Sequence, residues 1–112
     1  MQVEYDTNKL TTMCEDPKSR RGMWLDDNLW NDLQDAIAVL RSAPNLSDVL
    51  HSFRPHPVRF KKQRLYSIDI CRQYRVLFSA VGDDIYTNNS IDIRKVTAVR
   101  IEFVGDPHPF YN

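Results

Sequence analysis

Basic residues gather in one quarter of an otherwise neutral chain. The 112 residues include 15 basic and 15 acidic side chains, so the formal net charge is zero. Residues 51–75 hold a single acid, Asp69, against seven bases: Arg54, Arg59, Lys61, Lys62, Arg64, Arg72 and Arg75. Such segregation creates a local positive field that attracts phosphate even on a neutral protein. The segment is therefore a candidate for contact with nucleic acid, and a solvated charged loop is the alternative.

The cysteines and histidines do not have the spacing of a metal site. Cys14 and Cys71 are widely separated and form no CxxC pair. The histidines are His51, His56 and His108, and none lies at ligand spacing to another histidine, a cysteine or a pair of carboxylates. We expect both thiols to be reduced, and Cys71, within a strand-like run, to be buried and inert. No metal or other cofactor is expected.

Length and composition predict one soluble domain spanning residues 1–112. The chain is 42% hydrophobic and 27% charged, which is ordinary for a globular protein. No apolar stretch approaches the roughly 20 residues that a membrane helix needs. The first twenty residues contain no uninterrupted apolar segment of the kind found in secretory signals. We therefore expect a cytoplasmic protein without a membrane partner.

The N-terminal half predicts one strand and two helices. Residues 2–5 alternate polar and apolar, as a half-buried strand does, and residues 9–14 follow three good capping residues. The strongest helical signal covers residues 26–41, where apolar residues recur at steps of three and four: Leu29, Leu33, Ile37 and Leu40. Pro44 prevents its continuation, and residues 45–50 predict a capped turn or a single helical turn.

The C-terminal half predicts three strands. Residues 51–63, interrupted by two prolines, are expected to form an irregular basic connection. Residues 65–70 alternate and residues 74–81 are more continuously apolar, with a connection short enough for a hairpin. Residues 85–95 predict a loop with Asn88-Asn89 at its apex.

The last predicted strand covers residues 96–104, and its alternation groups Phe103 with Val99 and Ile101. The order of strand, helices and three strands predicts an α+β fold. We expect an N-terminal strand and a helical hairpin packed on a mainly antiparallel sheet of about four strands.

Three segments stand in order along the chain: residues 3–10 with LRSAPNLSD at 40–48, YSIDI at 66–70 with YRVLF at 74–78, and KVTAVRI at 95–101. Together they resemble the RelE/ParE toxin superfamily, close to its HigB-like killer-protein branch. The first segment is similar to the opening strand and helical hairpin of that branch. YSIDI at 66–70 followed by YRVLF at 74–78 resembles the superfamily's strand pair. KVTAVRI at 95–101 is similar to the last strand of the killer proteins and leads into a tail with His and Tyr.

The resemblance implies the toxin of a type II toxin–antitoxin pair. Relatives of this kind enter the ribosomal A site and cut mRNA during translation, without metal. The ribose 2′-hydroxyl attacks the adjacent phosphate, and the protein removes a proton, neutralises the developing charge and protonates the leaving oxygen. The implied partners are the ribosome with its mRNA and a helix-turn-helix, HigA-like antitoxin. Operator DNA would be bound only through the antitoxin complex.

The same resemblance assigns roles to individual residues. Arg75 is the arginine of the tyrosine–arginine step, where a guanidinium holds the scissile phosphate. His108 and Tyr111 stand where the superfamily places C-terminal catalytic residues; histidine titrates near neutrality, and tyrosine orients the hydroxyl or stacks on a base. The predicted surface for mRNA and ribosomal RNA consists of Arg54, His56, Arg59, Lys61, Lys62 and Arg64.

Asp69 departs from the family pattern. Many ribosome-dependent relatives carry a basic residue on the strand before the tyrosine–arginine step. An acid there repels phosphate, pairs with Arg75 or Arg72, or acts as a base, and the sequence leaves these roles open. The departure is compatible with a second function, that of a ParE-like toxin that binds DNA gyrase and needs no acid–base residues. A third is a non-toxic interaction module with the same fold.

Overall fold

A computed structural model gives the fold of the chain. It describes the side chains of residues 1–17, 26–50, 58–61, 63–71 and 73–107, and the backbone alone of residues 51–53 and 56–57.

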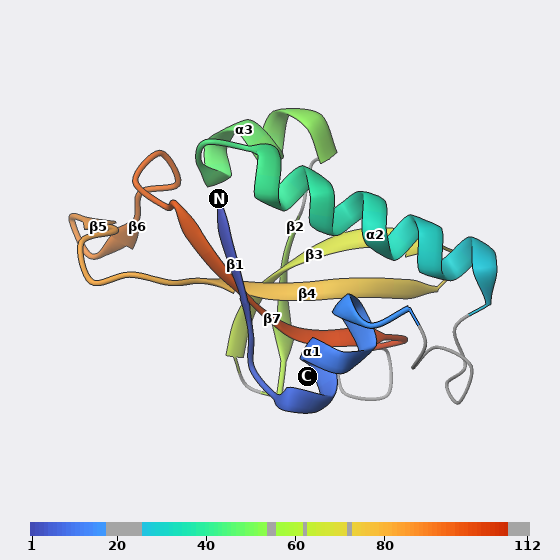
Figure 1. The fold of residues 1–112 in the computed structure, drawn as a ribbon. Coiled ribbons are helices and arrows are strands. Elements are labelled where there is room, and N and C mark those ends of the chain that lie inside the picture. Colours follow the sequence, from blue (N-terminus) through green and yellow to red (C-terminus); the bar gives the residue numbers. More distant parts are fainter. Residues whose placement is uncertain (18–25, 54–55, 62, 72, 108–112) are drawn as a thin grey trace.

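A five-stranded mixed sheet forms the middle of the molecule (Figure 1). Its spatial order is β1 (Gln2–Tyr5), β7 (Ala98–Gly105), β4 (Tyr74–Ala80), β3 (Gln63–Cys71) and β2 (His56–Phe60). The β1–β7 pairing is parallel and the other three are antiparallel. The α+β class and the mainly antiparallel pairing are confirmed. The expected number of about four strands is wrong for this sheet, because β2 adds a fifth.

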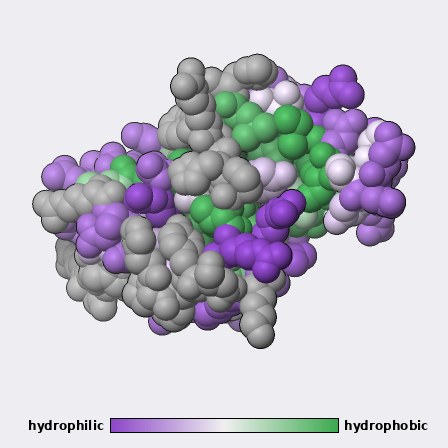
Figure 2. All heavy atoms as spheres, turned by 180° about the vertical axis from the view of Figure 1, so that it is seen from behind, coloured by the Kyte–Doolittle hydropathy of each residue, from purple (hydrophilic) through white to green (hydrophobic). Residues whose placement is uncertain are grey.

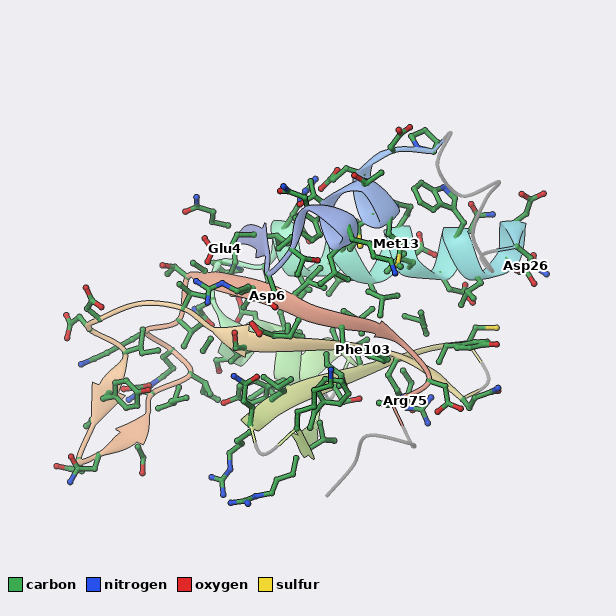
Figure 3. The ribbon with its side chains drawn as sticks, turned by 90° about the horizontal axis from the view of Figure 1, so that it is seen from below. Glu4, Asp6, Met13, Asp26, Arg75 and Phe103 are labelled. Carbon is green, nitrogen blue, oxygen red and sulfur yellow. The ribbon has the colours of Figure 1, made fainter. Side chains whose placement is uncertain are left out.

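Three helices accompany the sheet: α1 (Asn8–Glu15), α2 (Asp27–Ser42) and α3 (Leu46–Phe53). Thr7 and Asp26 are the N-caps of the first two, and their side chains accept the backbone N–H groups of Leu10 and Leu29 at 3.1 and 2.8 Å. These helices agree with the two helical predictions within a residue or two. Figure 3 shows α1 and α2 on the same side of the sheet.

Apolar side chains form two separate clusters on the two sides of the sheet. The larger lies between the helices and the sheet and includes α2 residues such as Leu33 and strand residues such as Val76 and Phe78. The smaller consists of Phe60, Leu65 and Leu77, with Val58 and Phe103 packed against them. We call the side that carries the smaller cluster the helix-free face, because none of the described helices covers it.

A bulge in β7 decides which side Phe103 occupies. Leu77 lies opposite Phe103, but the next residue of β4, Phe78, lies opposite Ile101, so Glu102 is an extra residue. The bulge reverses the alternation, and the ring of Phe103 packs against Phe60 with centroids 4.8 Å apart. The prediction that Phe103 shares a side with Val99 and Ile101 is therefore wrong.

Residues 51–63 are more regular than predicted. The helix α3 continues to Phe53, β2 begins at His56, and β2 pairs with β3 up to Phe60 opposite Gln63. Lys61, the turn residue that follows β2, has a φ of 49°. Pro57 is compatible with β2 because this strand lies at the edge of the sheet, where proline costs few ladder hydrogen bonds. The expected irregular connection and the single turn at 45–50 are both corrected.

Residues 85–95 contain a small hairpin of β5 (Tyr86–Thr87) and β6 (Ser90–Ile91), which the sequence had predicted as loop. The predicted apex at Asn88 and Asn89 is confirmed, because both have positive φ, 53° and 64°, as a two-residue hairpin turn requires. None of the described helices is both long enough and apolar enough to span a membrane.

Candidate nucleic-acid interface

The helix-free face combines charged, polar and apolar side chains. Because side chains alternate along a strand, β4 presents Arg75, Leu77 and Ser79 on this side, while Val76 and Phe78 enter the main core. Asp69 lies directly opposite Arg75 on β3, and Phe103 lies opposite Leu77 on β7. The predicted phosphate ligand thus lies at one end of a sheet surface whose middle is apolar.

Arg75 is held by its neighbours. Its Nε lies 2.7 Å from Asp69 Oδ1, and its Nη1 donates to the carbonyl oxygen of Tyr74 at 3.0 Å. The Arg75 side chain is 19% exposed, whereas that of Asp69 is 62% exposed. Of the three roles left open for Asp69, the structure shows pairing with Arg75. A phosphate that approaches Arg75 therefore shares the guanidinium with Asp69 or displaces it.

Three of the predicted RNA-binding residues lie together around the β2–β3 turn. Arg59 and Arg64 are directly opposite each other, and Lys61 lies in the turn with its Nζ 5.5 Å from the centroid of Phe60. Like charges in directly opposed positions repel, so a bound anion would relieve the repulsion between Arg59 and Arg64. All three are exposed. We call these residues the basic hairpin.

The basic hairpin and Arg75 are not adjacent. Arg64 is the second residue of β3, and Asp69, the partner of Arg75, is five residues further along the strand, which corresponds to roughly 17 Å of extended strand. The predicted phosphate surface therefore has two separate centres, one at each end of the strand pair.

The remaining predicted site residues are outside the described part of the chain. These are Arg54, Lys62, His108 and Tyr111, together with the side chain of His56, whose backbone lies in β2 opposite Ser67.

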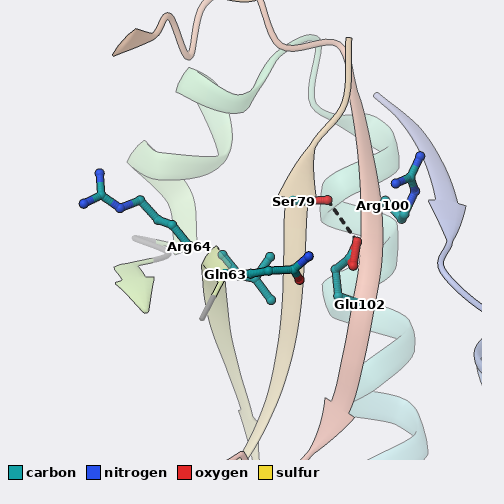
Figure 4. A pocket seen from close by; sticks show the side chains of 6 residues that line it. Gln63, Arg64, Ser79, Arg100 and Glu102 are labelled. Carbon is teal, nitrogen blue, oxygen red and sulfur yellow. Dashed lines mark hydrogen bonds between the residues drawn. The ribbon is translucent and has the colours of Figure 1, made fainter. Parts of the chain in front are cut away.

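A group that the sequence analysis missed lies around Glu102. Gln63, Arg64, Leu65, Ser79, Arg100 and Glu102 line an open cavity of about 260 Å³ (Figure 4). Ser79 Oγ donates to Glu102 Oε2 at 3.1 Å. Burial is the main cause that raises the pKa of Glu102 above its ordinary value; the Ser79 hydrogen bond acts in the opposite direction. The alternation of residues 96–104 places Arg100 and Glu102 on the same side of β7, which is a partial signal for this group. The sequence pattern does not show the bulge in β7 that brings Phe103 to the same side.

Arg100 is paired with the N-terminal strand. Its Nε and Nη2 lie 2.9 and 2.7 Å from Glu4 Oε1, in the parallel β1–β7 pair. The hydrogen bond to Glu4 raises the pKa of Arg100, so the guanidinium remains charged. The negative charges of Asp6 and Glu4 also raise the pKa of Glu102. This part of the helix-free face is therefore richer in carboxylates than the basic hairpin.

Ser67 is the one buried polar side chain without a hydrogen-bond partner among the described residues. It is fully buried on β3, opposite Leu77, between the apolar cluster and Asp69. A buried hydroxyl without a partner costs roughly 1–3 kcal/mol. Sequence reasoning had assigned it no role.

Of the two cysteines, Cys14 is buried and Cys71 is half-buried. Burial raises the pKa of Cys14 to about 12, so its thiol remains neutral. Cys71 is half-buried at the end of β3 and packs against the main core, which corrects the expectation that it is buried. In the described ranges, no three His, Cys, Asp or Glu side chains lie together as a metal site requires.

Comparison of the chain with models of protein families, with curated proteins and with solved structures gives no match. The resemblance to the RelE/ParE toxins therefore stays a prediction that rests on the three segments quoted above.

Proposed function

We propose that the protein is the toxin of a type II toxin–antitoxin pair that cleaves mRNA on the ribosome without a metal ion. The observation that carries the proposal is the composition of the helix-free face. It combines the guanidinium of Arg75, the aromatic ring of Phe103 and, at the far end of β3, the basic hairpin. Single-stranded RNA is bound by such combinations, because cations contact phosphates and aromatic rings stack on unpaired bases.

The surface supports the same proposal. Seen from behind the view of Figure 1, hydrophobic and strongly hydrophilic side chains adjoin one another (Figure 2). The α+β fold, with an N-terminal strand and two helices on one side of the sheet, is also the architecture that the resemblance implies.

In the proposed reaction, the ribose 2′-oxygen attacks the adjacent phosphorus and the bond from phosphorus to the 5′-oxygen breaks. The 2′-hydroxyl loses its proton to a base, and the leaving 5′-oxygen gains one. Arg75 stabilises the negative charge that develops on the phosphate oxygens, because its guanidinium cannot be deprotonated. The resemblance assigns the proton transfers to His108 and Tyr111, and the exposed carboxylate of Asp69 is a second candidate for the base.

The proposal includes the partners that the resemblance implies. A helix-turn-helix antitoxin would hold the activity in check, and the pair would bind operator DNA through the antitoxin. The ribosome would present the mRNA, and the protein would act in the cytoplasm.

The test is a reconstituted translation reaction in which mRNA ends are mapped by primer extension. Purified wild-type protein should produce cuts only on translated message. Arg75→Ala should reduce cutting by a hundredfold or more, since loss of one charge-stabilising group typically costs that much. Arg94→Ala is the matched control, because Arg94 is 79% exposed in a loop and pairs only with Asp92 among the contacts described. This variant should cut like the wild type.

One observation favours the gyrase-binding alternative. The ion pair with Asp69 neutralises Arg75, which a binding toxin tolerates and a phosphate-binding enzyme must overcome. If the mRNA stays intact while expression of the wild type arrests growth, the nuclease proposal is wrong, and inhibition of gyrase supercoiling becomes the assay. Expression without any growth defect would instead support a non-toxic interaction module.

A further inference from the structure

The cavity beside Glu102 has hydrogen-bonding groups that the fold does not use. Glu102 accepts from Ser79 through Oε2, and the described contacts give its Oε1 no donor. The side-chain amide of Gln63 likewise makes no hydrogen bond in the described part of the chain. Figure 4 shows this amide directed across the strands toward Glu102. A carboxylate oxygen and an amide are therefore both available to a ligand.

The cations around the cavity are directed elsewhere. The guanidinium of Arg64 points away from the Ser79–Glu102 pair in Figure 4, and Arg100 is committed to Glu4. With a carboxylate and an amide turned inward, the cavity suits a neutral ligand with both N–H and C=O groups better than a phosphate. Its volume of about 260 Å³ is below the roughly 300–1,000 Å³ of typical small-molecule sites, so the ligand is small.

We propose that this cavity binds one guanine base of a single-stranded RNA. The carboxylate of Glu102 accepts the two neighbouring donors of guanine, N1–H and N2–H, and the amide of Gln63 donates to the O6 carbonyl. This inference rests on the proposed function, because it takes the RNA to be the substrate of the helix-free face.

The other bases match this arrangement less well. Adenine and cytosine each present an acceptor nitrogen next to their amino group, which an ionised carboxylate repels, and uracil presents a single N–H between two acceptors. Only guanine offers two adjacent donors beside a carbonyl, and a good bidentate pair discriminates about tenfold or more against the wrong base.

The position of the cavity fits a base of the same RNA strand. Ser79 is four residues from Arg75 along β4, roughly 13 Å of extended strand. Phe103 lies opposite Leu77, between the two sites, and its partly exposed ring provides an apolar surface for the intervening nucleotides, whereas Leu77 itself is fully buried beneath it. A short single strand with its phosphate at Arg75 can therefore place a neighbouring base in the cavity.

The test measures fluorescence anisotropy of labelled uridine hexamers that carry one guanosine, inosine or adenosine at a central position. The wild type should bind the guanosine hexamer about tenfold more tightly than the adenosine hexamer. Inosine, which lacks the N2 amino group, should fall between them. Glu102→Gln should remove this ranking and leave binding of the plain uridine hexamer unchanged or slightly tighter.

Asp84→Asn is the matched control, because it also removes one negative charge but lies in an exposed turn away from the cavity. It should keep the ranking of the wild type. Thermal unfolding of both variants checks that they are folded. Guanosine monophosphate should compete only at far higher concentration than the guanosine hexamer, and competition at equal concentration would point to a free nucleotide as the ligand and overturn the RNA assignment.

Equal affinity of the wild type for guanosine and adenosine hexamers overturns the inference, as does a ranking that survives Glu102→Gln. The experiments on the proposed function have outcomes that are independent of this inference. A protein that cuts translated mRNA without a guanosine preference loses only this inference, and a protein with the preference that cuts nothing loses only the nuclease assignment.

Discussion

The two sides of the sheet use the same strands for different purposes. On β4, Val76 and Phe78 are fully buried between sheet and helices, whereas their neighbours Arg75, Leu77 and Ser79 face the opposite side. The helix-covered side is a continuous apolar core. On the helix-free face, a small apolar cluster is bordered by an ion pair at one end and by the Glu102 cavity at the other.

The difference shows how charge is organised on the helix-free face. Its arginines do not form a simple positive track, because Arg75 pairs with Asp69 and Arg100 pairs with Glu4. Away from the basic hairpin, hydrogen-bonding groups without a described partner are the amide of Gln63 and Oε1 of Glu102. The ligand proposed for this side would therefore be selected by hydrogen bonding and stacking as much as by charge, whereas the inner face of the helix-covered side is filled by the main core.

The largest effect should come from the helix-covered side. Phe78→Ala should lower the free energy of unfolding by about 3–5 kcal/mol, because it removes a fully buried ring and leaves a cavity between sheet and helices. Leu77→Ala, one residue away on the other side, should cost about 2–3 kcal/mol, since its cluster is small. Urea unfolding followed by circular dichroism measures both. Equal losses would contradict the assignment of the main core to one side.

Much of the fold was predictable because strong local patterns agree with the tertiary structure. The apolar stripe of α2 and the alternation of β3 each match one buried side, and Asn88-Asn89 could adopt the positive φ that its turn needs. The strand β2 was missed because Pro57 argues against a strand unless the strand is known to be at an edge. Edge position is a property of the assembled sheet and not of the segment.

The candidate site was less predictable because it depends on register. The pairing of Asp69 with Arg75 requires knowing that these residues are directly opposite each other, which the hairpin connection alone did not fix. The Glu102 cavity depends on a bulge that turns Phe103 to the helix-free face. A one-residue shift in a strand changes the side of every following side chain, so patterns alone could not locate either group.

The second prediction concerns RNA affinity at the Arg75 end. Asp69→Asn removes the carboxylate that now holds the guanidinium, so a phosphate no longer competes with it. We expect a uridine hexamer to bind several-fold to tenfold more tightly at low salt, with the gain shrinking as salt is raised. Anisotropy titrations at two salt concentrations measure this. Asp84→Asn is the control for net charge, and an equal gain in both variants would mean that Arg75 is not the phosphate ligand.

The third prediction concerns the buried hydroxyl on the helix-free face. Ser67→Ala should leave stability unchanged or raise it by up to about 1 kcal/mol, because it removes a fully buried hydroxyl that has no described partner. Ser79→Ala provides the contrast, since Ser79 donates to Glu102 and its loss should be mildly destabilising. Urea unfolding midpoints compare the two. A clear loss for Ser67→Ala would show that this hydroxyl has a partner in solution.

The smallest expected effect is the pH dependence that Glu102 gives to stability. Its pKa in the folded protein lies above the ordinary value of 4.5, so the folded state binds the proton more tightly than the unfolded state. Above the folded-state pKa, the ionised carboxylate therefore lowers stability, and this penalty disappears as the pH falls below 4.5. The groups around it are Ser79 and Arg100, which favour ionisation, and Asp6 and Glu4, which oppose it.

Glu102→Gln should therefore raise the melting temperature at pH 7 by roughly 1–3 °C, a small gain because the carboxyl is only partly buried. At pH 4, where the wild-type carboxyl is largely protonated, the two proteins should melt together. Thermal unfolding by circular dichroism at both pH values makes the comparison. A variant that is less stable at pH 7 would mean that Arg100 and Ser79 stabilise the carboxylate more than burial penalises it. The helix-free face would then be held together by that contact, and the cavity would be a structural feature before it is a binding site.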